Sequence, residues 1–328
     1  MELVEIGVGE IKACMLAFES LGVRSMATYV ETADVKLVID PGSALGPRFK
    51  LNPHEREYIA LAASRERILE AARQADILTI SHYHFDHYVP NFEDWLWIWS
   101  SPEIAAKLYK GKLILAKDIK TGINPSQRKR GYMFQKLTQP VAKEIISADG
   151  KIFNFGDTSI EFSKPVYHGP VGSKLGYVLM VTVRTPNCCL IHAPDIQGPM
   201  YAEPLELIVE KKPDVVVMGG PPIYLEGFKV ELGDLEVARE NLVTLAKHVR
   251  ILVVDHHLLR STDYVNYLKE AVYEAKKHGN RVLSAAEFMG KEPQLLEARR
   301  RELHEEQPIE RGWYERLRRG EFREGLRA

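Results

Sequence analysis

Short β-type runs alternate with helical stretches along most of this 328-residue chain, and this alternation constrains the fold more than any other feature. The segment MATYVETADVKLVIDPG at 26–42 predicts two strands that end in an Asp-Pro-Gly turn. Apolar residues at helical intervals predict a helix from about 52 to 73, and ADILTI at 75–80 predicts a buried strand. The pattern favours a layered α/β fold.

The second half of the chain continues the alternation. Residues 151–165 predict a hairpin around a Gly-Asp turn. Further strands are expected at GYVLMVTV, CCLIHAPD, DVVVMGG, RILVVDH and RVLSA, with helices at about 234–248 and 263–278. We therefore expect a single domain over residues 1–328, with a helical insert at about 89–150 and a helical C-terminal extension at about 290–328.

Composition narrows the class of protein. Hydrophobic residues make up 45% and charged residues 27%, as in globular proteins, and the formal net charge of −1 gives no global attraction to nucleic acid or membrane. The N-terminal MELVEIGVGE lacks the features of a signal peptide, and no segment reaches the roughly 18 apolar residues of a membrane span. Three cysteines, of which Cys188 and Cys189 are adjacent, indicate a reducing compartment. These features predict a cytoplasmic location.

The segment SHYHFDHY at 81–88 places three histidines and one aspartate directly after a predicted buried strand. On an extended loop, His82 and His84 project to the same side, while Asp86 and His87 can turn toward a neighbouring point. Imidazole and carboxylate are ligands that zinc and iron accept. The segment therefore predicts a site for two metal ions rather than a histidine-rich surface loop.

Other candidate ligands stand at the ends of later β-type runs. They are His168 in VYHGP, Asp195 in CCLIHAPD, and His256 with His257 in VVDHH. Each alone has a structural explanation, because a histidine at a strand end is often only packed. Together they supply the remaining ligands that a binuclear metal site needs.

In chain order, Asp40, HYHFDH, His168, Asp195 and His256 resemble the five motifs of the metallo-β-lactamase superfamily of metal-dependent hydrolases. The resemblance extends from about residue 25 to 260. Its layout is similar to lactonase-like and to uncharacterised prokaryotic, especially archaeal, branches of the superfamily. The resemblance implies a four-layer αββα sandwich with the site at one edge and the helical insert after the histidine loop.

The resemblance also implies two bound divalent metal ions, zinc first, with iron or manganese as alternatives. It assigns His82, His84 and His168 to the first ion. It assigns Asp86, His87 and His256 to the second ion, and Asp195 bridges the two.

Further roles follow from the same resemblance. Asp40 corresponds to an acid that orients the histidine loop without binding metal, and a turn-forming role before Pro-Gly is compatible with this. The fourth motif usually reads Gly-Asp, whereas here a proline precedes Asp195 and stiffens the backbone. The fifth motif offers two histidines; the resemblance favours His256 as the ligand and leaves His257 as a proton donor. His192 is expected to be packed or to support the ligands.

The expected chemistry follows from the ligand set. Two cations that share a water lower its pKa toward neutrality and present hydroxide as the nucleophile, while one of them polarises a carbonyl or phosphoryl oxygen. Asp86, Asp195 and His257 are the residues expected to act in catalysis, with Asp195 fixing the metal separation and accepting the proton of the water. Hydrolysis is the predicted reaction.

The substrate is constrained only by a basic, aromatic-bearing segment at 117–136. Its Arg128, Lys129, Arg130 and Tyr132 suit binding of phosphates and stacking on bases, and a solvated helix face is the alternative. A phosphoester or phosphodiester, in a nucleotide or RNA, is the first expectation, and a lactone or thioester is the second. The alternative from another class is a non-catalytic or redox metal protein. No membrane partner is expected.

Overall fold

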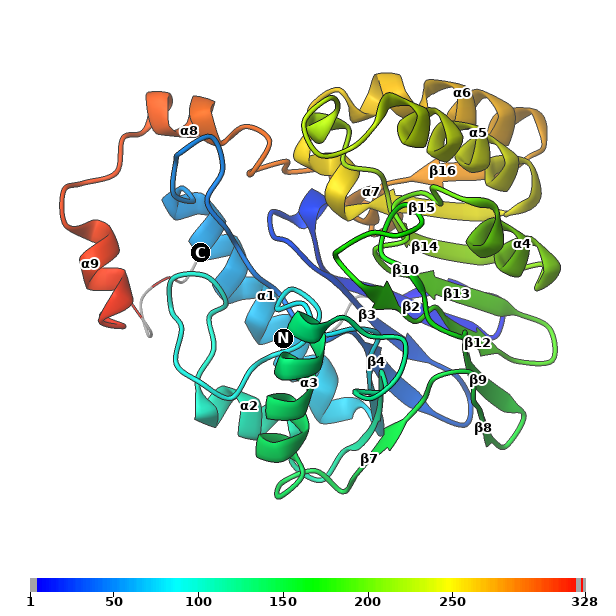
Figure 1. Cartoon of the computed structure of the whole chain (residues 1–328), viewed down its shortest axis with the longest axis horizontal. Helices are drawn as coiled ribbons and strands as arrows, with labels where there is room; N and C mark the ends of the chain where they lie inside the picture. The colour runs from blue at the N-terminus through cyan, green and yellow to red at the C-terminus, as the bar shows by residue number, and fades with distance from the viewer. Residues whose placement is uncertain (1–4, 323–325, 327–328) are drawn as a thin grey trace.

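The computed structural model describes residues 5–322 and 326, so the start of the chain and part of the predicted extension at 290–328 lie outside the described residues. Within the described residues, the chain forms two seven-stranded sheets and one two-stranded sheet. The two large sheets pack together, and helices cover their outer faces (Figure 1). This is a four-layer αββα sandwich, and it confirms the predicted fold class.

The first large sheet joins an antiparallel half to a parallel half. Its strands, in spatial order, are β1 (Ile6–Val8), β2 (Ile11–Phe18), β3 (Met26–Glu31), β4 (Lys36–Ile39), β5 (Ile77–Ile80), β6 (Leu113–Ala116) and β7 (Glu144–Ser147). From β1 to β4 the neighbours are antiparallel, and from β4 to β7 they are parallel. Parallel neighbours require crossover connections. These contain the helices α1 (Glu55–Gln74), α2 (Pro102–Tyr109) and α3 (Pro125–Thr138).

The second large sheet is built the same way. Its strands, in spatial order, are β16 (Arg281–Leu283), β15 (Ile251–Asp255), β14 (Val215–Gly219), β13 (Cys189–Ala193), β12 (Val181–Arg184), β9 (Thr158–Phe162) and β8 (Ile152–Phe155). The four strands from β13 to β16 are parallel, and the remaining pairs are antiparallel. The crossovers contain α4 (Ala202–Glu210), α5 (Leu232–His248) and α6 (Tyr264–Lys277).

Alternate side chains of the second sheet enter two different parts of the core. On β14, Val215 and Val217 pack into the core shared with the first sheet, whereas Val216 packs with apolar residues of α5 and α6. On β15, Val253 packs into the core shared with the first sheet, and Leu252 packs with the apolar residues of α5 and α6. Strands buried on both faces give unbroken apolar runs in the sequence, which is why these strands are readable from it.

Helix starts follow ordinary capping chemistry. The Ser101 hydroxyl accepts a hydrogen bond from the Ile104 N–H at 3.3 Å, and Pro102 occupies the first turn of α2. The Asn124 side chain caps α3 by accepting from the Gln127 N–H at 2.7 Å. These caps fix where each helix leaves the edge of the first sheet.

The segment at about 89–150 is helical only in part, which corrects the prediction of a helical insert. It holds α2 and α3, but also β6 and β7, which extend the first sheet beyond β5. The run LILA of β6 has four residues, too few for periodicity to separate a strand from a turn of buried helix. Parallel pairing with β5 fixes it as a strand.

After β16 the described chain forms the short helices α7 (Ala285–Phe288), α8 (Arg300–Glu306) and α9 (Trp313–Arg318). The ring of Trp313 lies 5.1 Å from that of Tyr58 on α1. Arg300 is fully buried and forms an ion pair with Glu57, also on α1, at 2.6 Å. The C-terminal segment therefore packs against α1. Among the described residues, no helix combines the length and the hydrophobicity that crossing a bilayer requires.

Candidate metal centre

The candidate ligands come from strand ends in both sheets. Asp40 follows β4, the segment 81–88 follows β5, and Asp195 lies two residues after β13. His168 follows β10 (Val166–Tyr167), which pairs with β11 (Tyr177–Val178). His256 begins η3 (His256–Arg260), directly after β15. Strand ends hold these side chains rigidly, and the packing of the two sheets brings them to a common point.

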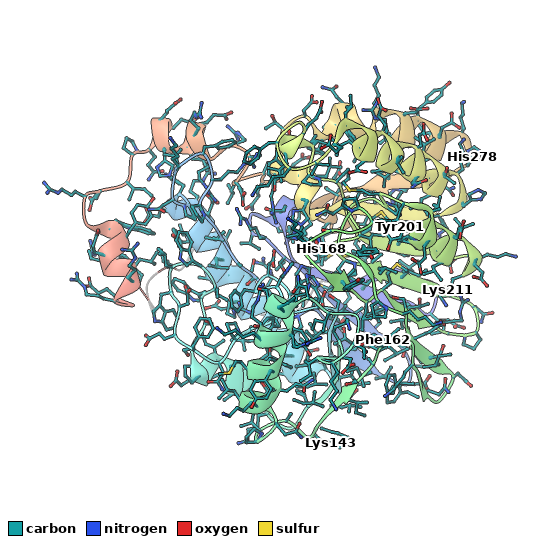
Figure 2. The ribbon with its side chains drawn as sticks, viewed as in Figure 1. Lys143, Phe162, His168, Tyr201, Lys211 and His278 are labelled. Atoms are coloured by element: carbon teal, nitrogen blue, oxygen red, sulfur yellow. The ribbon has the colours of Figure 1, made fainter. Side chains whose placement is uncertain are left out.

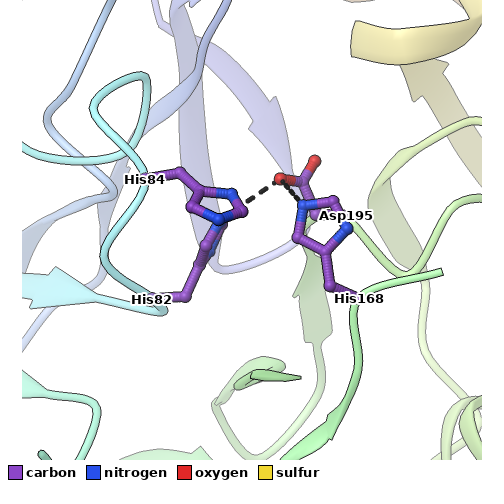
Figure 3. A group of neighbouring side chains, drawn as sticks. All are labelled: His82, His84, His168 and Asp195. Atoms are coloured by element: carbon purple, nitrogen blue, oxygen red, sulfur yellow. Dashed lines mark ion pairs between the residues drawn. The ribbon is translucent and has the colours of Figure 1, made fainter. Parts of the chain in front are cut away.

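The first group contains His82, His84, His168 and Asp195, whose ligand atoms lie within 4.8 Å of one another (Figure 3). The Nε2 of His168 is 2.9 Å from Oδ2 of Asp195, and the Nε2 of His82 is 3.2 Å from the same oxygen. Figure 2 shows His168 in the middle of the molecule, away from peripheral side chains such as Lys143 and His278. One carboxylate oxygen thus faces a histidine after the first large sheet and a histidine after the two-stranded sheet.

The second group contains Asp86, His87 and His256, also within 4.8 Å of one another. The Nε2 of His256 lies 3.2 Å from Oδ1 of Asp195 and 3.6 Å from Oδ2 of Asp86. The Nε2 of His87 lies 3.2 Å from Oδ2 of Asp195. Asp195 therefore adjoins both groups, in the position expected of a bridging ligand.

His257 also reaches this centre. Its Nε2 lies 3.4 Å from Oδ1 of Asp195, and its side chain retains 14% exposure. Neighbouring residues on a straight strand point to opposite faces, but η3 replaces the strand here, and the backbone of His256 has φ of +58°. Both rings therefore face Asp195, and the choice of His256 as the ligand stays a prediction.

The donor set fits a metal site. Several of its buried atoms have no hydrogen-bond partner among residues 5–322 and 326, namely Nε2 of His82, His87 and His256, both ring nitrogens of His257, and Oδ1 of Asp195. Buried polar atoms are nearly always hydrogen-bonded, and leaving one without a partner costs about 1–3 kcal/mol. Convergence of so many of them at one point is explained by a bound cation.

Residues around the centre orient the ligands. Asp40 accepts hydrogen bonds from the backbone N–H of Ser81 at 2.7 Å, from the Ser81 hydroxyl, and from Nδ1 of His87 at 2.9 Å. A ligand atom of Asp40 also lies within 4.8 Å of those of His82 and His87, and its role as an orienting acid stays a prediction. The Ser81 hydroxyl also lies 3.0 Å from Nδ1 of His82. His192 is buried, and its Nε2 lies 2.8 Å from the Met26 carbonyl oxygen. Fixing one ring nitrogen points the other toward the metal position.

Burial and charge set the protonation of the ligands. Burial, followed by repulsion from His87, lowers the pKa of His82 to about 4, so its imidazole is neutral near pH 7. Burial also holds the pKa of His84 and of His257 well below the ordinary value. Burial opposes ionisation of Asp195, but the neighbouring histidines, His168 first, hold the pKa of this carboxyl well below its usual range. His87 differs: burial opposes its protonation, but the Asp195 carboxylate and the hydrogen bond to Asp40 hold its pKa well above the ordinary value. Metal ligands are neutral imidazoles and ionised carboxylates, so metal binding at His87 would release a proton.

The backbone at the centre adopts unusual conformations. Asp40, Asp195 and His256 have φ of +51°, +33° and +58° respectively, in the left-handed region that non-glycine residues rarely adopt. A Cβ added to Gly42 would lie 2.1 Å from the Tyr88 backbone nitrogen, so only glycine lets the turn after Asp40 approach the ligand loop this closely. Strain of this kind is typical of functional sites.

The pair Glu19 and Arg260 adjoins the second group and was not predicted from the sequence. Arg260 Nε donates to Glu19, and its Nη2 lies 3.5 Å from Nδ1 of His256 and 4.0 Å from Oδ2 of Asp86. Its Nη1 lies 3.4 Å from the Tyr224 hydroxyl. Burial raises the pKa of Glu19 to about 7, against the opposing charge of Arg260. The only signal in the sequence is an arginine one helical turn after His256.

The four residues predicted to bind substrate all lie on α3 and do not contact the ligands in the described structure. Arg128 donates to the Lys120 carbonyl at 3.1 Å, and Tyr132 is 54% exposed. Lys129 and Arg130 line a cavity that also includes Phe85 of the ligand loop. Lys129 and Arg130 therefore lie beside Phe85 of the ligand loop, whereas Arg128 and Tyr132 do not line this cavity.

The two packed sheets and the order of the strand-end residues define the class: the chain has a metallo-β-lactamase fold. Within that class the chain belongs to the UPF0282 family. It is 46% identical over 293 residues to the UPF0282 protein of Methanopyrus kandleri, covering 89% of this chain and 98% of the relative. It is 42% identical to that of Thermococcus sibiricus, covering 93% and 100%. No family model matches the chain.

Solved structures with a similar fold include one from Bacillus subtilis and one from Streptomyces venezuelae. The metallo-beta-lactamase fold protein YhfI from Bacillus subtilis is 16% identical, with a TM-score of 0.45, covering 80% of this chain and 88% of that one. CmlA, a diiron beta-hydroxylase from Streptomyces venezuelae, is 12% identical, with a TM-score of 0.47, covering 85% of this chain and 53% of that one.

Proposed function

We propose that this chain is a hydrolase that depends on two divalent metal ions. The observation that carries the proposal is the convergence of unpartnered imidazole and carboxylate atoms on both oxygens of Asp195. A structural network would satisfy these atoms with one another, because unpaired buried polar groups are costly.

The ligand set divides into two groups around one carboxylate. We assign His82, His84 and His168 to one ion, Asp86, His87 and His256 to the other, and Asp195 to both. Seven ligands exceed what one tetrahedral ion uses, and nitrogen and oxygen donors suit zinc, with iron or manganese also accepted. Bound ions of this kind lower the pKa of a water toward neutrality and polarise an ester or phosphoryl oxygen.

The residues of the chain contribute positioning and proton transfer. Asp40 holds the ring of His87 in place, and Asp86 lies on the partly exposed side of the centre, with 18% side-chain exposure. His257 is neutral near pH 7 because burial lowers its pKa, and its 14% exposure leaves it open to solvent. A neutral imidazole beside Asp195 suits it to exchange a proton with the reacting group.

A phosphate ester is the substrate that the surroundings favour. Arg260 contributes a buried guanidinium whose Nη atoms contact Tyr224, His256 and Asp86 at long distances of 3.4 to 4.0 Å, on the side of the second group. Guanidinium groups bind phosphate oxygens and stabilise charge that develops during phosphoryl transfer. We propose a phosphomonoester or phosphodiester substrate, such as a nucleotide or RNA.

The test combines metal analysis with a substrate panel. Protein loaded with zinc, iron or manganese is assayed on a phosphodiester, a phosphomonoester, a lactone and a thioester. We expect phosphate-ester hydrolysis that Asp195→Asn lowers by about 100-fold or more, because Asn keeps the shape but not the charge between the ions. The control Asp157→Asn, at an exposed hairpin position, should retain full activity.

The alternatives give different results. Turnover of the lactone or thioester alone would replace the phosphate ester as the substrate class. Two bound ions without turnover of any ester would favour the non-catalytic or redox alternative and overturn the hydrolase proposal.

A further inference from the structure

A cavity of about 290 Å³ lies between the ligand loop and α3. The ligand loop (residues 81–88) contributes Phe85 to its lining, and Phe92 follows shortly after the loop. Helix α3 contributes Lys129, Arg130 and Met133. This volume is near the lower end of the range for small-molecule sites, which is roughly 300–1,000 Å³.

The cavity and the metal centre share the ligand loop, although none of the candidate ligands lines the cavity. Phe85 stands between the candidate ligands His84 and Asp86, and consecutive Cα atoms are only about 3.8 Å apart. These three residues are partly exposed, whereas His82 and His87 are buried. The wall of the cavity therefore starts one residue away from ligands on the open side of the centre.

Aromatic rings dominate the loop side of the cavity. The ring of Phe85 lies 5.7 Å from that of Phe92 and 5.6 Å from that of Tyr88. Phe92 and Met133 are each 43% exposed, which leaves apolar surface available. Exposed aromatic faces are the surfaces on which flat rings stack, at about 1–3 kcal/mol for each base.

The charge on the cavity has one sign. Its lining, within the described residues, includes Lys129 and Arg130 and no acidic residue. The Arg130 guanidinium lies over the Phe85 ring at 5.3 Å, and its Nη2 donates to the Ser126 hydroxyl at 2.8 Å. This leaves the arginine both placed over the ring and free to attract an anion.

We propose that this cavity binds the flat aromatic part of an anionic substrate, with the substrate's phosphate passing over the loop tip to the metal centre. The substrate class is then an aryl or nucleoside phosphate. This inference rests on the proposed function and adds to it a second contact site for the substrate. The small volume and the stacked cation favour a flat ring over a long alkyl chain.

The test compares three ligands on the metal-loaded full chain by titration calorimetry: inorganic phosphate and the hydrolysis-resistant phosphonate analogues of 2-naphthyl phosphate and octyl phosphate, which are named below by their parent esters. We expect 2-naphthyl phosphate to bind about tenfold or more tighter than inorganic phosphate, which corresponds to about 1.4 kcal/mol from stacking. Phe92→Ala should remove most of this preference and leave the affinity for inorganic phosphate nearly unchanged, because Phe92 offers only a ring to the ligand. Arg130→Gln should also lower the preference, because it removes the cation over the Phe85 ring.

A matched control lies elsewhere on the surface. Tyr273 on α6 is 61% exposed and has the Lys277 ammonium over its ring at 4.4 Å, so it copies the exposed ring and cation outside the cavity. Tyr273→Ala should keep the full preference. Metal content is measured for every variant, so that a loss of preference with two ions still bound reports on the cavity alone.

Two results would overturn the inference: equal affinity for 2-naphthyl and inorganic phosphate, or equal affinity for 2-naphthyl and octyl phosphate. Either could occur while phosphate esters are still hydrolysed, and the proposed function would then stand. A metal-loaded protein that hydrolyses no ester would instead contradict the proposed function, whatever the binding data show.

Discussion

Asp40 controls a ligand without being one in the proposed site. It is fully buried and receives hydrogen bonds from Ser81 and from Nδ1 of His87, which turns Nε2 of His87 toward Asp195. Burial opposes its ionisation, but the hydrogen bond and charge of His87 hold the pKa of Asp40 below its usual value. An ionised Asp40 thus fixes both the orientation and the tautomer of His87.

Replacing Asp40 should weaken metal binding at the group that contains His87. Asn tolerates the left-handed backbone at this position, so Asp40→Asn removes charge with little backbone strain. We expect the affinity for one ion to fall by about 10- to 100-fold, measured by competition with a chelator. Asp34→Asn, which alters another hydrogen-bonded aspartate far from the ligands in sequence, is the control. Equal metal affinity in both variants would remove Asp40 from this role.

The adjacent histidines after β15 can be separated by metal analysis. We expect His256→Ala to lose about one metal equivalent, because it removes a ligand, whereas His257→Ala should keep both ions and mainly lower the rate. Loss of an ion in His257→Ala alone would move the ligand by one residue. Both rings lie near Asp195, so the distances do not decide the assignment.

The sequence predicted the residues of the centre where local spacing carries information. The H-x-H-x-D-H segment and the later strand-end residues meet around Asp195, as the resemblance implied. Glu19 and Arg260 are 241 residues apart, and neither lies in a recognisable motif. Their contact depends on the packing of two sheets, which no local pattern encodes.

At the scale of elements, the turn after β4 and the ligand loop after β5 touch through Gly42. A side chain there would meet backbone atoms of His87 and Tyr88, which cannot move aside as a flexible side chain would. We expect Gly42→Ala to lower the free energy of unfolding by about 1–3 kcal/mol, measured by urea titration, and to weaken metal binding. Gly7→Ala on β1, where a Cβ meets nothing within 4 Å, should change stability by about 0.5 kcal/mol or less. Similar losses in both would contradict this contact.

Two buried cysteines make the free energy of unfolding depend on pH in the alkaline range. Burial raises the pKa of Cys14 on β2, and of Cys188 just before β13, to about 11, above the roughly 8.5 of an unfolded thiol. A folded pKa above the unfolded one gives stability that is full below about pH 8.5 and is lost as the pH rises toward 11. We expect the urea midpoint to fall over this range, and to fall less in Cys14→Ala. An identical decline in that variant would show that Cys14 contributes nothing to it.

Elements with long or strongly apolar patterns were predicted from the sequence, and short ones were not. The strands β14 and β15 and the helices α5 and α6 agree with expectation to within a few residues. The strands β6 and β7 were assigned to a helical insert, because four-residue runs carry no usable period. Pairing of β6 with β5 and of β7 with β6 determines them, and pairing is a property of the assembled sheet.

At the scale of the whole molecule, the metal centre depends on the two sheets meeting. The first sheet supplies Asp40 and the ligand loop, and the second supplies Asp195 and His256. A partly buried ion pair between Glu297 and Arg24 and a fully buried one between Arg300 and Glu57 connect the C-terminal segment to the first half of the chain. Neither sheet holds a complete ligand set, so metal binding should report on the docking of the two halves.

The most direct test of the account is to locate the metal by anomalous scattering from zinc in crystals of the full chain. We expect two peaks, each at about 2.0–2.2 Å from a different oxygen of Asp195, with His82 and His168 beside one and Asp86 and His256 beside the other. A single peak, or two peaks of which neither contacts Asp195, would contradict it.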